Sequence, residues 1–131
     1  MPAITLLSSR TLSYHLDEEP KGSPIVLLVN SLCAPFTVWH RVRNILNQKG
    51  FRTLRYDQPG HRQSSVPDDL NATTFTSLAK GVHDLLGALD IQHLYAWIGI
   101  SMGAATGFYF VTQNPHVVKK FVAWIQSVAQ Q

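Results

Sequence analysis

The residues best suited to do chemistry lie at Gly99-Ile100-Ser101-Met102-Gly103, where glycines stand two positions either side of a serine. An apolar run precedes this G-x-S-x-G pattern and small residues follow it, which is typical of a strand that turns sharply into a helix and lifts the serine hydroxyl clear of the backbone. The glycines let the strand and the helix approach each other. Ser101 would then stand at the positive end of a helix, beside the backbone N–H of Met102, which can donate to an oxyanion. The pattern therefore marks Ser101 as a candidate nucleophile.

Two other interpretations of this stretch stay open at the level of the sequence. A five-residue glycine–serine pattern also arises by chance in an ordinary glycine-containing turn. The segment from Leu94 to Thr112 carries no charge and is nearly as long as the roughly 20 apolar residues that cross a bilayer. Its internal glycines weaken the second interpretation, and the charges at its two ends give no clear orientation signal.

Length and composition predict one soluble globular domain over residues 1–131. Of these 131 residues 45% are hydrophobic, and the net charge is +3, with eleven basic residues scattered singly or in loose pairs. No basic stripe interleaved with aromatic residues occurs, so we expect no nucleic-acid partner. The single cysteine, Cys33, excludes an internal disulfide. The N-terminus lacks the pattern of a secretory signal, so we expect a cytoplasmic protein with no membrane partner.

The elements needed to position Ser101 can be read along the chain. Short strands are expected at 3–7 and 11–16, as an antiparallel hairpin, and the apolar, mostly β-branched run 25–29 predicts a strand covered on both faces. Four apolar residues then fall on one helical face, and Gly50 ends that helix; they are Phe36, Trp39, Val42 and Leu46. The next strand is predicted at 51–56.

The second half of the chain continues the alternation of helix and strand. The segment from Phe75 to Leu89 has the clearest helical stripe of apolar residues. A strand at 95–99, a helix at 102–113 and a strand at 117–125, interrupted at its start by two lysines, follow. Such an alternation of strand and helix is typical of an α/β fold with a parallel sheet.

Three motifs, in this order, make the chain similar to the α/β-hydrolase superfamily, and among its branches to the 3-oxoadipate enol-lactonase-like proteins. The first is Asn30-Ser31-Leu32 after an apolar strand; the second is Asp57-Gln58-Pro59-Gly60-His61 with two serines behind it; the third is the Ser101 pattern itself. The resemblance covers about residues 25–122. It implies a mostly parallel sheet with an N-terminal antiparallel hairpin and helices on both faces, truncated to the N-terminal half of one hydrolase domain.

The resemblance also implies a role for each matching position. Ser101 would attack an ester or lactone carbonyl, and the backbone N–H groups of Met102 and Leu32 would form the oxyanion hole. Asn30 and Ser31 would shape the substrate-binding loop. A second loop would have a structural role, bracing the first beside the serine; its matching residues are Asp57, Gly60 and His61. Arg62, at a position usually held by glycine, and Cys33-Ala34-Pro35 depart from the family pattern.

The largest departure is the missing partner of the serine. The family order places the acid and then the histidine after the serine, but no acidic residue follows Asp90, and the later histidines, His93 and His116, flank the far ends of the strand and helix that meet at Ser101. We therefore expect little or no activity from this chain alone. We further expect an exposed sheet edge that favours self-association or a non-catalytic role in binding a partner. No cofactor or metal-ligand motif is present in the sequence, so we expect neither.

Overall fold

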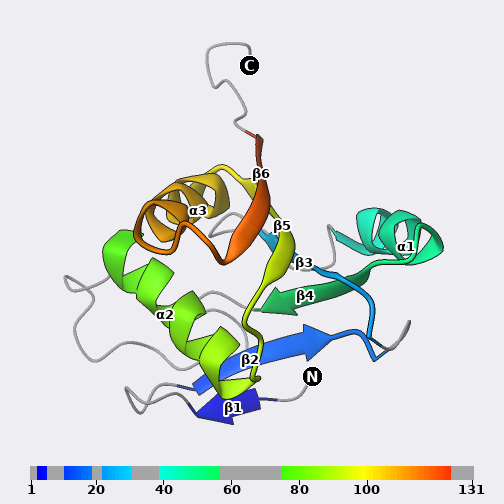
Figure 1. The fold of residues 1–131 in the computed structure, drawn as a ribbon, viewed down its shortest axis with the longest axis horizontal. Coiled ribbons are helices and arrows are strands. Elements are labelled where there is room, and N and C mark those ends of the chain that lie inside the picture. Colours follow the sequence, from blue (N-terminus) through cyan, green and yellow to red (C-terminus); the bar gives the residue numbers. More distant parts are fainter. Residues whose placement is uncertain (1–2, 6–10, 19–21, 31–38, 57–74, 125–131) are drawn as a thin grey trace.

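The computed structural model describes residues 3–5, 11–18, 22–30, 39–56 and 75–124. Within these ranges the strands and helices alternate as the sequence predicts (Figure 1). In chain order they are β1 (Ala3–Thr5), β2 (Thr11–Leu16), β3 (Ile25–Val29), α1 (His40–Gln48), β4 (Arg52–Tyr56), α2 (Phe75–Ala88), β5 (Leu94–Ile100), α3 (Met102–Gln113) and β6 (Val118–Trp124).

The described strands form one six-stranded sheet in the order β1-β2-β4-β3-β5-β6. The strands β4, β3, β5 and β6 run parallel, whereas β1 and β2 pair antiparallel with each other and β2 pairs antiparallel with β4. The prediction of a mostly parallel sheet with an N-terminal antiparallel hairpin is confirmed. Because β3, β4 and β5 are parallel, their C-terminal ends meet at one edge of the sheet, which is where a site in such a fold is expected.

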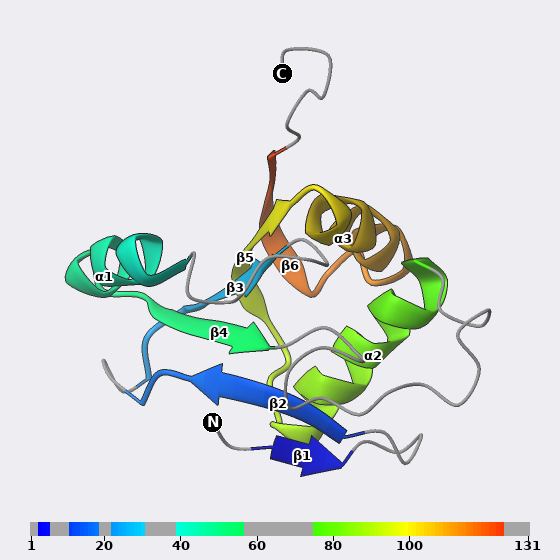
Figure 2. The ribbon, with the colours of Figure 1, turned by 180° about the vertical axis from the view of Figure 1, so that it is seen from behind.

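The direction of each crossover explains which face each helix covers. The chain passes from β3 to β4 in one direction across the sheet, and from β4 over to β5 and on to β6 in the opposite direction. Because parallel crossovers are right-handed, α1 must lie on one face while α2 and α3 lie on the other. Figures 1 and 2 show this separation, with α2 and α3 together and α1 apart. Helices on both faces are therefore confirmed.

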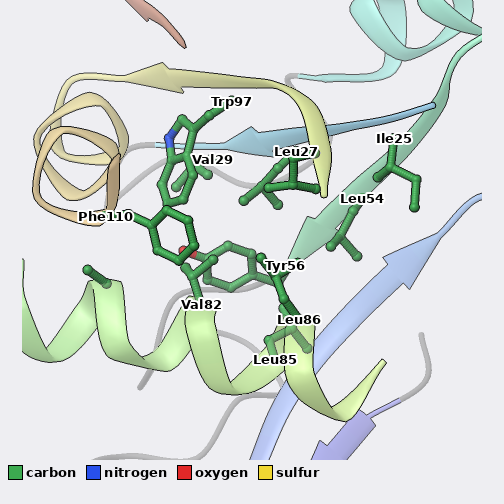
Figure 3. Close-up of a cluster of buried hydrophobic side chains, with 12 residues drawn as sticks. Ile25, Leu27, Val29, Leu54, Tyr56, Val82, Leu85, Leu86, Trp97 and Phe110 are labelled. Atoms are coloured by element: carbon green, nitrogen blue, oxygen red, sulfur yellow. The ribbon is translucent and has the colours of Figure 1, made fainter. Parts of the chain in front are cut away.

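The core has two parts, one under each layer of helices. On the side of α2 and α3, alternate residues of β3 pack with Trp97, Phe110 and the buried stripe of α2 (Figure 3). On the side of α1, the remaining residues of β3 pack with Trp39 and Ala96. All five residues of β3 are buried, which confirms the prediction that this strand is covered on both faces.

The structure corrects the sequence interpretation of β6. We predicted that two lysines would interrupt the start of this strand, but β6 runs without a break through Lys119 and Lys120. Both Nζ atoms lie over the ring of Tyr95, at 5.5 and 5.6 Å from its centroid. A cation over an aromatic face is stabilised by the ring quadrupole, so these lysines are accommodated in the strand and do not end it.

The uncharged segment from Leu94 to Thr112 is divided between the strand β5 and the helix α3. No helix in the described part of the chain has the length and apolar character that crossing a bilayer demands. The alternative interpretation of this segment as a membrane span is therefore wrong.

Candidate active site

Ser101 occupies the junction between β5 and α3, where the chain reverses within a single residue. Its backbone torsions are φ 53° and ψ −111°, and among the described residues only Asp90 shares a positive φ without being glycine. This conformation is costly for a residue with a Cβ and is typical of functional turns. Ser101 is exposed, so the strained turn presents its hydroxyl to solvent.

Hydrogen bonds hold the backbone of Ser101 on both sides. Its carbonyl oxygen accepts from the N–H groups of Ala104 at 2.9 Å and Ala105 at 3.1 Å, and its own N–H donates to the carbonyl oxygen of Trp124 at 2.8 Å. The first two bonds belong to the opening turn of α3, and the third reaches across to the end of β6. The unusual torsions are therefore fixed by neighbouring elements, as a strained residue requires.

The two glycines of the motif are required by close backbone approaches. A Cβ placed on Gly99 would lie 2.5 Å from the carbonyl carbon of Gly103, and a Cβ placed on Gly103 would collide with the carbonyl oxygen of Val29. Both obstacles are backbone atoms, which cannot rotate away as a side chain can. The steric reason that the sequence suggested for these glycines is therefore present in the structure.

Trp97, on β5, supports the turn through a hydrogen bond to Gly103, a role that no pattern in the sequence predicts. Its side chain is fully buried, and its Nε1–H donates to the carbonyl oxygen of Gly103 at 3.1 Å. Its ring also contacts that of Phe110, with centroids 5.1 Å apart. In the sequence Trp97 is one member of an apolar run, and nothing there distinguishes a packing residue from one that also anchors the first turn of α3.

The candidate oxyanion donor beside Ser101 is the backbone N–H of Met102, the first residue of α3. The first N–H groups of a helix have no carbonyl within the helix to donate to, and the helix dipole makes this end positive. An oxygen gaining negative charge next to Ser101 would meet that amide. The proposed second donor, Leu32, lies outside the described residues, as does Ser31.

Asn30 is the described end of the other predicted loop. It follows β3 directly and is buried, with 3% of its surface exposed. Val29 is paired in register with Gly99, so Asn30 and Ser101 lie at the same edge of the sheet, on neighbouring strands. The structure therefore brings the start of the Asn30-Ser31-Leu32 loop next to the candidate nucleophile. The second predicted loop, with Asp57, Gly60 and His61, lies outside the described residues.

An open pocket of about 560 Å³ adjoins Ser101 on the side of α3 and β6. We call it the α3–β6 groove. Its lining is apolar apart from the hydroxyl groups of Ser101 and Tyr109, and no histidine or carboxylate belongs to it. The lining residues, all in the described part of the chain, are Phe75, Ser101, Met102, Ala104, Ala105, Phe108, Tyr109, Phe121 and Ala123.

The two histidines that follow Asp90 in the sequence lie far from Ser101. His93 precedes β5 (Leu94–Ile100) and Ser101 follows it, so eight residue steps of about 3.3 Å place the two roughly 26 Å apart along the strand. His116 lies near His93, because both line a second pocket, which includes Pro24 at the start of β3. Neither can take a proton from Ser101, as the sequence indicated. No group of three or more His, Cys, Asp or Glu side chains that could hold a metal occurs among the described residues.

Asp17 is a buried carboxylate in the described part of the chain. It lies beside the N-terminal end of β4, whereas Ser101 lies at the C-terminal ends of the parallel strands. Its Oδ2 accepts from the backbone N–H of Thr53 at 2.8 Å, from the Thr53 hydroxyl at 2.6 Å and from Nδ2 of Asn47 at 3.0 Å, while Oδ1 accepts from Nε of Arg43 at 2.8 Å. These contacts join the end of β2 to β4 and α1. Asp17 is therefore a structural residue and not the acid missing from beside the serine.

The hydrogen bonds to Asp17 also determine its ionisation. Burial alone would raise the pKa of this carboxyl, but the bonds from Asn47, Thr53 and Arg43 outweigh it and lower the pKa to about 2. Nearby, burial and the positive charge of Arg55 lower the pKa of His15. Asp17 thus stays ionised and paired with Arg43 at neutral pH.

The fold, the strained serine between a parallel strand and a helix, and the amide that follows it define a class of protein. Residues 24–124 match the family model for the alpha/beta hydrolase fold, and the chain belongs to that family. A hydrolase from Pseudomonas aeruginosa superposes with a TM-score of 0.83 at 28% sequence identity, over 98% of this chain. The enol-lactonase from Burkholderia xenovorans superposes with a TM-score of 0.82 at 30% identity, over 92% of this chain.

The relatives are about twice as long as this chain. The chain covers 49% of the P. aeruginosa hydrolase and 45% of the B. xenovorans enol-lactonase. A curated protein of Synechocystis sp., named "Putative non-heme chloroperoxidase", is 29% identical over 105 residues, which is 79% of this chain and 37% of that protein. The chain thus spans about half of the α/β-hydrolase fold, or less, in each of these relatives.

Proposed function

We propose that this chain forms the N-terminal half of a serine hydrolase that acts on a small carboxylic ester or an enol-lactone, with Ser101 as its nucleophile. The observation that carries the proposal is the exposed Ser101 at φ 53°, placed between β5 and the first amide of α3. The similarity to an enol-lactonase at 30% identity supports the choice of substrate class. The Synechocystis relative carries a different name, so the choice of substrate class rests on the similarity to the enol-lactonase.

The proposed reaction follows from the atoms at the turn. The Oγ of Ser101 forms a bond to the carbonyl carbon of the substrate, and the carbonyl electron pair moves to the oxygen, which the N–H groups of Met102 and Leu32 stabilise. The carbonyl then re-forms as the C–O bond of the ester or lactone breaks, and the leaving oxygen takes up the proton that Ser101 has given to a base. Water hydrolyses the remaining acyl-serine to the acid and restores the Ser101 hydroxyl. Asn30 and Ser31 shape the loop that carries the Leu32 donor and contact the substrate.

The serine needs a base to take its proton, and no described residue near Ser101 supplies one. The α3–β6 groove holds no histidine, and His93 and His116 are at the far edge of the sheet. Loss of the base costs on the order of 10⁶-fold in a well-studied serine protease. We therefore propose that the chain by itself is catalytically incomplete, and that a histidine and an acid must come from another segment.

Labelling with a fluorophosphonate tests the nucleophile role. The chain and its Ser101→Ala variant are incubated with the probe beside the full-length B. xenovorans enol-lactonase, and adducts are located by intact-mass and peptide mass spectrometry. We expect rapid labelling of the enol-lactonase, and slow labelling of this chain that is confined to Ser101. An adduct that persists in the Ser101→Ala variant, or labelling of another residue, would contradict the proposal.

A second candidate function is the binding of a partner without catalysis, including self-association through the outer edge of β6, the last strand of the described sheet. It is favoured by exposed apolar residues on β6, where Val122 is 50% and Trp124 is 63% exposed. Exposed edges and apolar patches of this kind favour association. Sedimentation over a range of concentrations, together with amide hydrogen exchange, distinguishes the possibilities. A chain that stays monomeric at every concentration, with its β6 amides protected from exchange, would count against self-association.

A further inference from the structure

A second open pocket, of about 570 Å³, lies at the end of the sheet opposite Ser101, where β5 and β6 begin. We call it the His93–His116 pocket, because His93 before β5 and His116 before β6 both line it. Figure 1 shows these two strands side by side. Its volume lies within the range of about 300–1,000 Å³ that is usual for small-molecule sites.

The pairing of β5 with β6 brings the two histidines to the same end of the sheet. The N–H of Leu94 donates to the carbonyl oxygen of Val117 at 2.8 Å, and each histidine comes directly before one of these two residues. Leu94 also stands opposite Val118 in the register of the parallel strands. The two imidazoles are therefore held near each other by backbone hydrogen bonding, although they are distant in the sequence.

The pocket combines an apolar interior with a polar rim. Its floor and walls are apolar or aromatic side chains that are buried or half-buried, namely Ile25, Leu94, Tyr95, Val117 and Val118. Its rim has three exposed side chains that donate hydrogen bonds: His93, His116 and Lys119. Such a pocket suits a ligand with a hydrocarbon body and one polar end that accepts hydrogen bonds.

The charge of the rim determines which polar end fits. Lysine is positively charged at neutral pH, and the Nζ of Lys119 is held over the ring of Tyr95, 5.5 Å from its centroid. Asp90, in the turn that precedes β5, does not line the pocket. Among the described residues no carboxylate forms a salt bridge with either histidine or with Lys119. A concave site lined by charge of one sign attracts the opposite charge, so an anion is favoured.

Two histidines in one pocket could also suggest a metal ion, but the rest of the pocket does not fit one. Zinc sites in proteins use three or four protein ligands. No group of three or more side chains able to hold a metal occurs in the described ranges. Lys119 would in addition place a positive charge beside the ion. The pocket therefore fits an anion better than a cation.

We propose that the His93–His116 pocket binds a small organic carboxylate with an apolar body. Its carboxylate accepts hydrogen bonds from the rim, which are strengthened by the charge of the acceptor. Its body covers Ile25 and Leu94 and removes apolar surface from water, which a wholly polar anion such as phosphate would not do. This pocket and Ser101 lie at opposite ends of β5, so the binding site is separate from the proposed hydrolysis and does not rest on it.

Titration of the chain with hexanoate, followed by NMR of the backbone amides and the imidazole rings, tests the proposal. We expect a dissociation constant on the order of 1 mM for a ligand of this size, with the largest shifts at His93, His116 and Lys119. Acetate has the charge without the hydrocarbon body, and 1-hexanol has the body without the charge. Each should bind at least about fivefold more weakly than hexanoate.

Substitutions in the rim test which side chains bind the carboxylate. Lys119→Gln should weaken hexanoate binding by about fivefold or more, and His93→Gln and His116→Gln by about threefold each. Lys120→Gln is the matched control for the lysine, because its Nζ lies 5.6 Å from the same Tyr95 centroid but Lys120 does not line the pocket. His83→Gln, on α2, is the control for the histidines. All the substituted side chains are exposed, so the variants keep their fold.

Several outcomes would overturn the proposal. These are the absence of saturable shifts around the pocket, binding of acetate or 1-hexanol as tight as that of hexanoate, and equal effects of Lys119→Gln and Lys120→Gln. Shifts confined to the α3–β6 groove would also overturn it, because they would place the acid beside Ser101. Ser101→Ala should bind hexanoate as the original chain does. Fluorophosphonate labelling of Ser101 is a separate measurement, so a failure of either proposal leaves the other standing.

Discussion

The N–H of Ser101 donates to the carbonyl oxygen of Trp124 at 2.8 Å. This bond ties the candidate nucleophile to the last described residue of β6, beside the α3–β6 groove. The conformation of the turn at Ser101 therefore depends on the position of the end of β6. A change at the end of β6 should alter the protection of the Ser101 amide.

Removal of residues 124–131 tests that link, with a chain that ends at Trp124 as the reference for loss of the seven residues that follow it. In a chain that ends at Ala123, the N–H of Ser101 loses its acceptor, and a typical net hydrogen-bond contribution of about 1 kcal/mol corresponds to roughly fivefold faster amide exchange. The Trp124 side chain is 63% exposed, so little packing is lost. Hydrogen exchange followed by NMR measures the effect. The N–H of Leu94, which donates to the Val117 carbonyl at 2.8 Å at the far end of β5, is the internal control, and equal acceleration at both amides would contradict the prediction.

Gly103→Ala should destabilise the protein, because the new methyl group would collide with the carbonyl of Val29. Overpacking of this kind costs typically about 1–3 kcal/mol of the free energy of unfolding. Gly81→Ala, in the middle of α2 with open space around the added Cβ, should instead stabilise it by up to about 1 kcal/mol, since alanine favours a helix. Urea unfolding of both variants measures the two changes, and a loss of stability in both, or in neither, would mean that the close approach at Gly103 is not what requires glycine.

The fold was largely predictable because each buried segment carries a local pattern. The unbroken apolar run of β3 and the stripe of α2 define their elements without reference to anything distant. One interpretation failed because distant contacts decide it. Lys119 and Lys120 were expected to interrupt β6, but the ring of Tyr95 on the neighbouring strand accommodates both.

The candidate site was predictable to the extent that it is local. The turn at Ser101 and its glycines lie within five residues, and their spacing alone indicates the geometry that the structure shows. The contribution of Trp97, whose indole holds the carbonyl of Gly103, was not predictable because a buried indole and a plain core residue look alike in a sequence. The place of Asn30 beside Ser101 depends on the register of β3 with β5, which only the sheet determines.

Substitutions at Ser101 itself should reveal the strain of the turn. Ser101→Gly relieves a positive φ that costs a residue with a Cβ about 1–3 kcal/mol, although glycine also gains freedom in the unfolded chain. We expect Ser101→Gly to be more stable than Ser101→Ala by about 1 kcal/mol, while both lose fluorophosphonate labelling. Alanine is the matched control because it removes the hydroxyl and keeps the Cβ. Equal unfolding free energies for the two variants would show that the turn is not strained.

The pH dependence of stability should report the carboxylate of Asp17. Its pKa is about 2 in the folded protein and 3.8 in the unfolded reference, so the unfolded chain binds its proton first as the pH falls. The ionised Asp17 therefore adds about 2 kcal/mol to the free energy of unfolding above about pH 5, and this contribution is lost as the pH falls through 3.8 to 2.

Urea unfolding of the original chain and of Asp17→Asn between pH 2 and pH 7 tests this assignment. The variant should be less stable near neutral pH, because Arg43 and Thr53 lose an ionised acceptor, and the difference between the two proteins should shrink at the acid end. Glu18→Gln is the control, since Glu18 is the exposed neighbour of Asp17, and it should follow the original chain throughout. A constant difference between Asp17→Asn and the original chain across the whole range would show that the hydrogen bonds to Asp17 do not depend on its charge.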